Sequence, residues 1–191
     1  DPRVSPREYL LLERRSETRN EYWRGQVFAM AGASRAHGLI TFNLAGELRE
    51  ALKGTPCEAF TSDLRVKIEA SDTYTYPDLV IACDPPEFED DHLYTLRNPT
   101  TLIEVLSAST ESYDRGQKFA AYRTLTSLRE YVLVAQDQPL VEHFVRDGFR
   151  WTLTESRGLD SSLRLVSPSC IIPLREIYDR VSFDERGPRR N

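Results

Sequence analysis

The sequence predicts an α/β fold in which a central mixed β-sheet is flanked by helices and carries additional β-hairpins. Short apolar runs bounded by turn residues predict buried strands, and longer segments with helical spacing predict amphipathic helices. One helical segment lies between two apolar runs, which is typical of a crossover joining parallel strands. The chain has 191 residues, so we expect a single domain over residues 1–183 and a disordered tail over residues 184–191.

The N-terminal part of the chain predicts two helices and a hairpin. Residues 5–8 have the capping-box pattern, so a short helix begins there and is expected to end near Thr18. Residues 21–30 alternate around a glycine-containing turn, which predicts the hairpin. Residues 34–53 carry apolar side chains at helical spacing and end before Gly54, as expected for the long amphipathic helix.

The rest of the chain supplies the sheet. Strands are predicted at residues 57–60, 64–69, 78–83, 101–106 and 130–134. A helix capped by Thr110 or Ser112 fills the crossover between the last two. A second hairpin over residues 140–153 turns at an Asp-Gly pair, and a short helix covers residues 174–178.

Composition limits the function classes. No apolar stretch approaches the roughly 18 residues that a membrane span requires. The formal net charge of −5 argues against a protein that coats nucleic acid electrostatically, although an acidic nuclease can have a locally basic cleft. Cys57, Cys83 and Cys170 are widely spaced and form no Cys-x-x-Cys pair. With no apolar signal region at the N-terminus, we expect reduced, buried thiols and a cytoplasmic protein.

The arginines are clustered along the sequence. They gather at Arg14, Arg15 and Arg19, at Arg115, Arg123 and Arg129, and at Arg186, Arg189 and Arg190. Each cluster taken alone is interpreted as a solvated face or, in the last case, as part of the tail.

Two carboxylates stand inside segments that are otherwise apolar. Asp78 opens the run at residues 79–83, and Glu104 interrupts the run at residues 101–106. A buried carboxylate is costly unless a metal ion or a cationic side chain compensates it. Lys118, one of three lysines in the chain, follows on the crossover helix. Two acids and a lysine are a minimal set for metal-dependent hydrolysis of a phosphodiester.

In this hypothesis the two acids bind Mg²⁺ or Mn²⁺, which prefer hard oxygen ligands. The backbone carbonyl of Val105 is a further candidate ligand, because it follows Glu104 on the same strand. Lys118 would supply a compact positive charge to the attacking water or to the phosphorus.

Each of these residues also has a structural interpretation. Asp78 would take a turn hydrogen bond after Pro77. Glu104 would face solvent from an edge strand or pair with a buried base. Lys118 would form a surface pair with Asp114, worth about 0.3–0.5 kcal/mol. The occurrence of all three in this order favours the functional interpretation.

The motifs resemble a known family. They are Tyr76 to Ile81, Leu102 to Ser107, Ser109-Thr110, Tyr113 to Lys118, Tyr122 and Leu128 to Val134. In this order they resemble the Uma-type "putative restriction endonuclease" family, whose members are assigned to the PD-(D/E)XK nuclease superfamily. The similarity extends back through Glu21, Gly25, Ser34, His37 and Asp63 and covers most of residues 1–180.

The resemblance implies a restriction-endonuclease-like core and a magnesium-dependent or manganese-dependent endonuclease that acts on DNA. The superfamily pattern has a lysine where this chain has Leu106, so Lys118 on the following helix is its expected replacement. The resemblance also implies that Glu21 is an additional metal ligand, with a surface acid of the hairpin as the alternative. His37 and Asp63 match family positions; His37 would contact phosphate or, alternatively, have a structural role.

A duplex substrate also suggests a homodimer. Apolar residues of the second hairpin, Val141, Phe144 and Trp151, are candidates for its interface. Two other function classes stay open. One is a non-catalytic module that binds nucleic acid or protein, and the other is a metal-independent glycoside hydrolase that uses Asp78 and Glu104 as acid and base.

Overall fold

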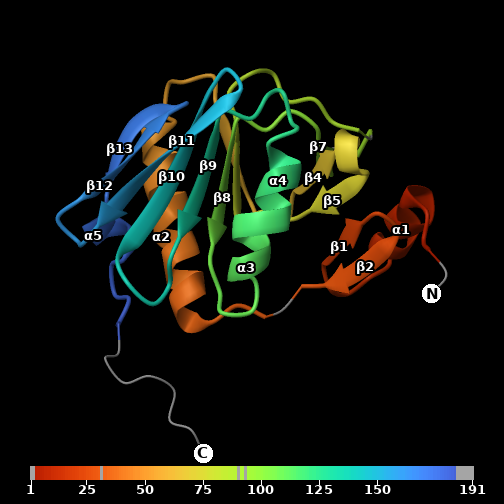
Figure 1. Ribbon diagram of the computed structural model, residues 1–191, viewed down its shortest axis with the longest axis horizontal. Coiled ribbons are helices and arrows are strands. Elements are labelled where there is room, and N and C mark those ends of the chain that lie inside the picture. Colours follow the sequence, from red (N-terminus) through yellow and green to blue (C-terminus); the bar gives the residue numbers. More distant parts are fainter. Residues whose placement is uncertain (1–2, 31, 90, 93, 184–191) are drawn as a thin grey trace, which may run out of the picture.

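A six-stranded mixed sheet forms the centre of the protein, which we describe from a computed structural model (Figure 1). The structure describes residues 3–30, 32–89, 91–92 and 94–183, so the predicted tail at 184–191 lies outside it. The strand order is β11-β10-β9-β8-β6-β3. Their bounds are β3 Glu58–Thr61, β6 Leu79–Ala82, β8 Thr101–Val105, β9 Glu130–Val134, β10 Leu140–Asp147 and β11 Arg150–Arg157. β8 and β9 are parallel, as the crossover predicts, and the other neighbours are antiparallel.

The two faces of this sheet are covered differently (Figure 1). One face packs against α2 (Arg35–Ala51), α5 (Leu174–Ile177) and the hairpin of β12 (Ser162–Val166) and β13 (Ser169–Pro173). The other face packs against a helical segment made of α3 (Glu111–Tyr113), a π-helical turn (Asp114–Lys118) and α4 (Phe119–Tyr122). Side chains of β8 and of Leu106, which follows it, alternate between the two cores, with Ile103 and Val105 in the first and Leu102 and Leu106 in the second. Glu104 therefore faces the crossover helix.

A second sheet of five short strands stands beside the first, in the order β2-β1-β5-β4-β7. Its strands are β1 Asn20–Trp23, β2 Gln26–Ala29, β4 Arg65–Ile68, β5 Thr73–Thr75 and β7 Thr95–Leu96. The first helix, α1 (Pro6–Glu13), packs on this sheet through Tyr9, whose ring stacks on Tyr22 and is tilted against Tyr74. The sheet brings β1 next to β5, and so brings the N-terminal hairpin close to the segment that precedes Asp78.

Most of the predicted elements are present, and the predicted fold class is confirmed. The capping box of Ser5 and Glu8 is confirmed, but α1 ends at Glu13 instead of Thr18, because Ser16 hydrogen-bonds the Thr18 carbonyl in a turn. The hairpin β12–β13 was not predicted. In the described part of the chain, no helix combines the length and apolar character that crossing a membrane requires.

The residues of the hairpin β10–β11 that suggested a dimer interface are buried to different degrees. Val141 is fully buried in the central core. Phe144 and Trp151 pack on Phe119 of α4, with ring centroids 4.6 and 5.4 Å away. Phe144 and Trp151 are nevertheless only partly buried, so burial excludes Val141 alone from a dimer interface.

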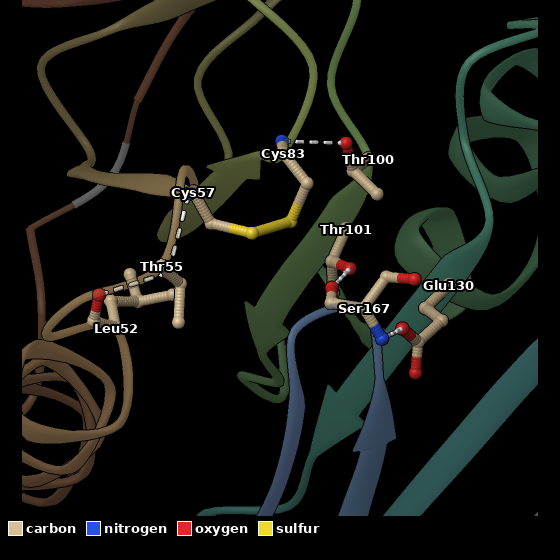
Figure 2. Close-up of a disulfide and its surroundings, with 8 residues drawn as sticks. All are labelled: Leu52, Thr55, Cys57, Cys83, Thr100, Thr101, Glu130 and Ser167. Carbon is tan, nitrogen blue, oxygen red and sulfur yellow. Dashed lines mark hydrogen bonds between the residues drawn. A yellow bond between two sulfur atoms is a disulfide. The ribbon is translucent and has the colours of Figure 1, made fainter.

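Two of the cysteines form a disulfide, which corrects the expectation of reduced thiols. Cys57 directly precedes Glu58 and Cys83 directly follows Ala82, which are register partners, so the antiparallel strands β3 and β6 bring the cysteines together (Figure 2). The backbone N–H of Cys83 also donates to the Thr100 hydroxyl (2.9 Å), which connects this end of β6 to β8 (Figure 2). Cys170 is free. The cytoplasmic prediction therefore loses the support of reduced thiols.

Breaking this disulfide should destabilise the protein. The bridge joins residues 26 positions apart, and a loop of that length corresponds to about 3–4 kcal/mol in the free energy of unfolding. Urea denaturation of Cys57→Ser should show this loss, whereas Cys170→Ser should remain close to the parent under the same conditions. Equal stability of both variants would contradict a stabilising bridge.

Candidate active site

A buried lysine forms the centre of a cluster of acids between the two sheets. Lys118, at the end of the π-helical turn, places its Nζ 2.9 Å from Glu104 Oε1 on β8 and 3.0 Å from Glu21 Oε1 on β1. Asp114, one turn earlier, lies 3.7 Å away. Lys118 is 5% exposed, so its interpretation as part of a solvated surface pair is wrong.

The acid pair is fixed by hydrogen bonds from neighbouring elements. Asp78 Oδ2 accepts the backbone N–H of Val105 (2.7 Å), and Oδ1 lies 2.9 Å from His37 Nε2. His37 is in the first turn of α2, where the Ser34 hydroxyl caps the helix by accepting the His37 N–H (3.0 Å). Asp78 is therefore connected to β8 and α2, and the turn hydrogen bond considered for it after Pro77 is not what holds it.

Glu104 lies on an internal strand and has a neutral partner as well as a cationic one. The Tyr122 hydroxyl donates to Glu104 Oε1 (2.9 Å) and lies 3.0 Å from the Thr75 hydroxyl. The rings of Tyr113 and Tyr122 lie 5.8 and 5.9 Å from the Lys118 ammonium. Both tyrosines belong to the motifs that carry the resemblance, but sequence reasoning gave them no role in the site. The i,i+4 spacing of Tyr122 from Lys118 could have indicated that residue.

Glu21 was expected to be either a metal ligand or a surface acid, and the surface interpretation is wrong. Its side chain is 12% exposed, contacts Lys118 and accepts the backbone N–H of Tyr76 at 3.1 Å. Asp63, which also matches a family position, does not join the cluster. Among the described residues its ionic partner is Arg19, at 3.3 Å on the exposed surface.

Burial dominates the electrostatics of these groups. It raises the pKa of Glu104 well above its ordinary range, which Lys118 offsets only in part. Burial also raises the pKa of Asp78, although the hydrogen bond from the Val105 N–H lowers it in part. Burial likewise raises the pKa of Asp114, which the charge of Lys118 lowers in part. Burial alone would lower the pKa of Lys118, but the nearby Glu104 and Glu21 outweigh it and raise the pKa, so the ammonium stays charged.

These shifts predict that the metal-free protein loses stability as the pH rises. The folded-state pKa of Glu104 lies well above the ordinary value of 4.5, so the folded protein binds this proton more tightly than the unfolded chain does. The resulting stabilisation is full below pH 4.5 and declines as the pH rises through the raised pKa. The urea midpoint, measured in EDTA at increasing pH above 4.5, should fall as the pH rises. Glu104→Gln should reduce the slope of the urea midpoint against pH. An unchanged slope in Glu104→Gln would contradict this origin.

The donor set suits a hard divalent cation. The carboxylates of Glu21, Glu104 and Asp114 lie within 3.7 Å of one ammonium, and Asp78 interacts with it electrostatically. Carboxylate oxygens are the ligands that Mg²⁺ and Mn²⁺ prefer. Within the described residues, however, no three acid, histidine or cysteine side chains are gathered closely enough to hold a metal ion. The side chains are therefore of the right chemical type for a divalent cation. The position between Glu21 and Glu104, however, is taken by the Lys118 ammonium.

A family model described as "Putative restriction endonuclease", Uma2, matches residues 6–174 of this chain. The chain belongs to the Uma2 family. The matched region contains the whole cluster from Glu21 to Lys118, and the resemblance inferred from the motifs is confirmed.

Two relatives of this Uma2 chain come from Synechocystis sp. and are described as uncharacterized proteins. Protein sll1609 is 38% identical over 157 residues, which are 82% of this chain and 89% of the relative. Protein slr1290 is 34% identical over 183 residues, which are 95% of each chain. The crystal structure of a putative nuclease belonging to DUF820 from Anabaena variabilis has a TM-score of 0.76 and covers 94% of this chain and 99% of its own. Its identity is 16%, so this similarity supports the fold alone.

Proposed function

We propose that this Uma2 protein is a metal-dependent endonuclease that hydrolyses phosphodiester bonds of DNA. The observation that carries the proposal is the buried cluster in which Glu21 of β1 and Glu104 of β8 meet Lys118 of the crossover helix, next to Asp78 at the start of β6. Burying more carboxylates than cations costs stability, so a purely structural cluster would not be expected to contain this excess. The excess of acids therefore favours a catalytic role. Membership of the Uma2 family supports a nucleic-acid substrate.

In this proposal Asp78, Glu104, Glu21 and the Val105 carbonyl would hold Mg²⁺ or Mn²⁺. The ion would supply positive charge at the scissile phosphate. The chain itself orients the acids: His37 and the Val105 N–H hold the Asp78 carboxylate, and the Tyr122 hydroxyl holds Glu104.

Lys118 acts in this proposal as a charge and not as a base. Its raised pKa keeps the ammonium protonated, so it stabilises the negative charge that develops on the attacking water and the phosphoryl oxygens. Tyr113 and Tyr122 limit the positions that its side chain can take.

The test is cleavage of supercoiled plasmid, single-stranded DNA and RNA with Mg²⁺, Mn²⁺ or EDTA. We expect metal-dependent cleavage of DNA by the parent and no cleavage by Glu104→Gln. Glu58→Gln removes an exposed carboxylate from β3 of the same sheet and serves as the matched control. Cleavage that persists in EDTA, or in Glu104→Gln, would contradict the proposal, and preference for RNA would correct the substrate.

A non-catalytic binding module is the second candidate. It is favoured by the ion pairs of Lys118, which already compensate two of the acids, and by the lack of a three-ligand group among the described residues. In that case nucleic acid should bind while Mg²⁺ and Mn²⁺ leave the melting temperature unchanged.

The homodimer remains a prediction that rests mainly on the proposed duplex substrate, because Val141 is fully buried while Phe144 and Trp151 are only partly exposed. Light scattering at high micromolar concentration should give twice the chain mass of 22.0 kDa. A monomeric mass at that concentration would contradict the prediction.

A further inference from the structure

A polar cavity of about 450 Å³ lies beside the candidate active site, on the side of the second sheet. Its walls include Arg14 and Arg19, which follow α1, together with Arg65 of β4 and the ring of Tyr76. The first two belong to the arginine cluster that the sequence led us to interpret as a solvated face. Their position in the cavity wall shows that these two arginines face an enclosed space and not only open solvent.

Arg65 is a buried cation with neutral immediate partners. It is 5% exposed; its Nε donates to the Thr95 hydroxyl (3.1 Å) and one terminal nitrogen donates to the Tyr76 hydroxyl (3.3 Å). Among the described residues, no carboxylate lies within 4.0 Å of its guanidinium. Glu13 compensates the Arg65 charge only indirectly, through the Tyr76 hydroxyl, which donates a hydrogen bond to Glu13 (2.9 Å). A guanidinium in such surroundings favours an anion that arrives from the cavity.

The cavity as a whole is basic, although the chain carries a net charge of −5. Three arginines line it against two acids, Glu13 and Asp63. Glu13 is already engaged by the backbone and side-chain nitrogens of Asn20, at 3.0 and 2.9 Å. The Asp63 side chain is 79% exposed and pairs with Arg19. A local excess of arginine is suited to phosphate, which a guanidinium binds with two parallel hydrogen bonds.

Aromatic rings accompany these charges. The Arg19 and Arg65 guanidiniums each lie 5.9 Å from the centre of the Tyr76 ring. The stacked rings of His92 and Tyr94 form a further part of the wall, with centroids 5.8 Å apart. Tyr76 itself is buried, whereas His92 and Tyr94 are exposed. Guanidiniums and exposed aromatic rings in one cavity are the combination that binds the phosphate and the base of a single nucleic-acid strand.

Tyr76 connects the cavity to the candidate active site. Its ring lines the cavity, while its backbone N–H donates to Glu21 of the acid cluster, and Asp78 follows two residues later. A ligand in the cavity is therefore separated from the acids by a single short segment.

We propose that this cavity binds one nucleotide of the nucleic-acid strand that passes the acid cluster, with its phosphate on the arginines and its base against the aromatic wall. The inference rests on the proposed function in one respect: a nuclease would place a nucleic-acid strand beside the acid cluster. Its occupant is a nucleotide within a strand and not a free nucleotide.

The test measures binding without cleavage. Fluorescence polarisation of a labelled single-stranded oligonucleotide in EDTA compares two double variants with equal charge change. Arg14→Gln with Arg19→Gln removes cavity arginines, whereas Arg7→Gln with Arg15→Gln removes exposed arginines of the same helix and its end, which do not line the cavity. Melting curves confirm that both variants fold.

We expect the cavity variant to bind the oligonucleotide at least about tenfold more weakly than the parent. The slope of log affinity against log salt concentration should fall by about one for each arginine removed. The control variant should bind like the parent. Equal losses in both variants would overturn the inference, because they would show attraction by overall charge. A nucleoside monophosphate or inorganic phosphate that competes as well as the unlabelled oligonucleotide would overturn the assignment to a strand.

The outcome is separate from that of the cleavage assay. If DNA is cleaved while both double variants bind alike, the cavity inference fails and the endonuclease proposal stands. If the cavity variant alone loses binding while no metal supports cleavage, the inference stands and the endonuclease proposal fails.

Discussion

Replacing Lys118 by methionine should lower the rate of DNA cleavage by about 10²–10³-fold, the effect of removing one preorganised charge from a transition state. Methionine keeps much of the apolar stem between the rings of Tyr113 and Tyr122, so the loss reports on the ammonium. Lys118→Arg should recover little activity, because a planar fork does not reproduce a point charge between Glu21 and Glu104. Initial rates on plasmid, with melting curves for each variant, provide the measurement.

The same variant should separate metal binding from turnover. The ammonium lies between two of the carboxylates that would hold the ion, so its removal should leave the affinity for Mg²⁺ equal or higher. Lys53→Met, which removes an exposed lysine paired with Glu50 on α2, is the control and should keep parental rates. Parental turnover in Lys118→Met would remove this lysine from the mechanism.

Asp78→Asn should abolish the stabilisation by divalent metal without unfolding the protein. Saturating metal at 100 times its Kd adds about 2.7 kcal/mol, or roughly 5–10 °C in the melting temperature of a domain of this size. Asparagine retains an oxygen that accepts the Val105 N–H, and it removes a buried negative charge whose pKa burial has raised. The metal-free variant should therefore be at least as stable as the parent.

Asp63→Asn is the matched comparison for this experiment. It makes the same chemical change at an exposed acid that also matches a family position but lies outside the cluster. It should keep the full response to metal. If Asp78→Asn melts well below the parent and still responds to metal, Asp78 is a structural residue that connects β6 to β8.

The elements of the site were predictable from local patterns. A carboxylate that interrupts an apolar strand has to find a compensating group, and this reasoning identified Asp78 and Glu104 before any contact was known. The helical segment between two apolar runs predicted the parallel pair β8 and β9, which the structure confirms. The position of Lys118 followed from that crossover.

Contacts between distant parts of the chain were not predictable. Glu21 reaches Lys118 because β1 pairs with β5, a pairing that no local pattern determines. The disulfide depends in the same way on the register of β3 with β6. Arg65 also illustrates the limit, since a strand residue gives no sign in the sequence of whether its side chain ends in solvent or beside a cavity.

The π-helical turn at Asp114–Lys118 makes the site sensitive to chain length. A π turn holds one residue more than an α turn, so the helix before it and the helix after it are offset by about 100° relative to a continuous α-helix. Deleting Gly116, which has open space around it, would therefore remove little packing but would rotate Lys118 and α4 together relative to Tyr113 and Asp114. Substitutions at this glycine should be tolerated, whereas insertions or deletions here should not. The length of this segment, more than the identity of its middle residues, sets where the lysine points.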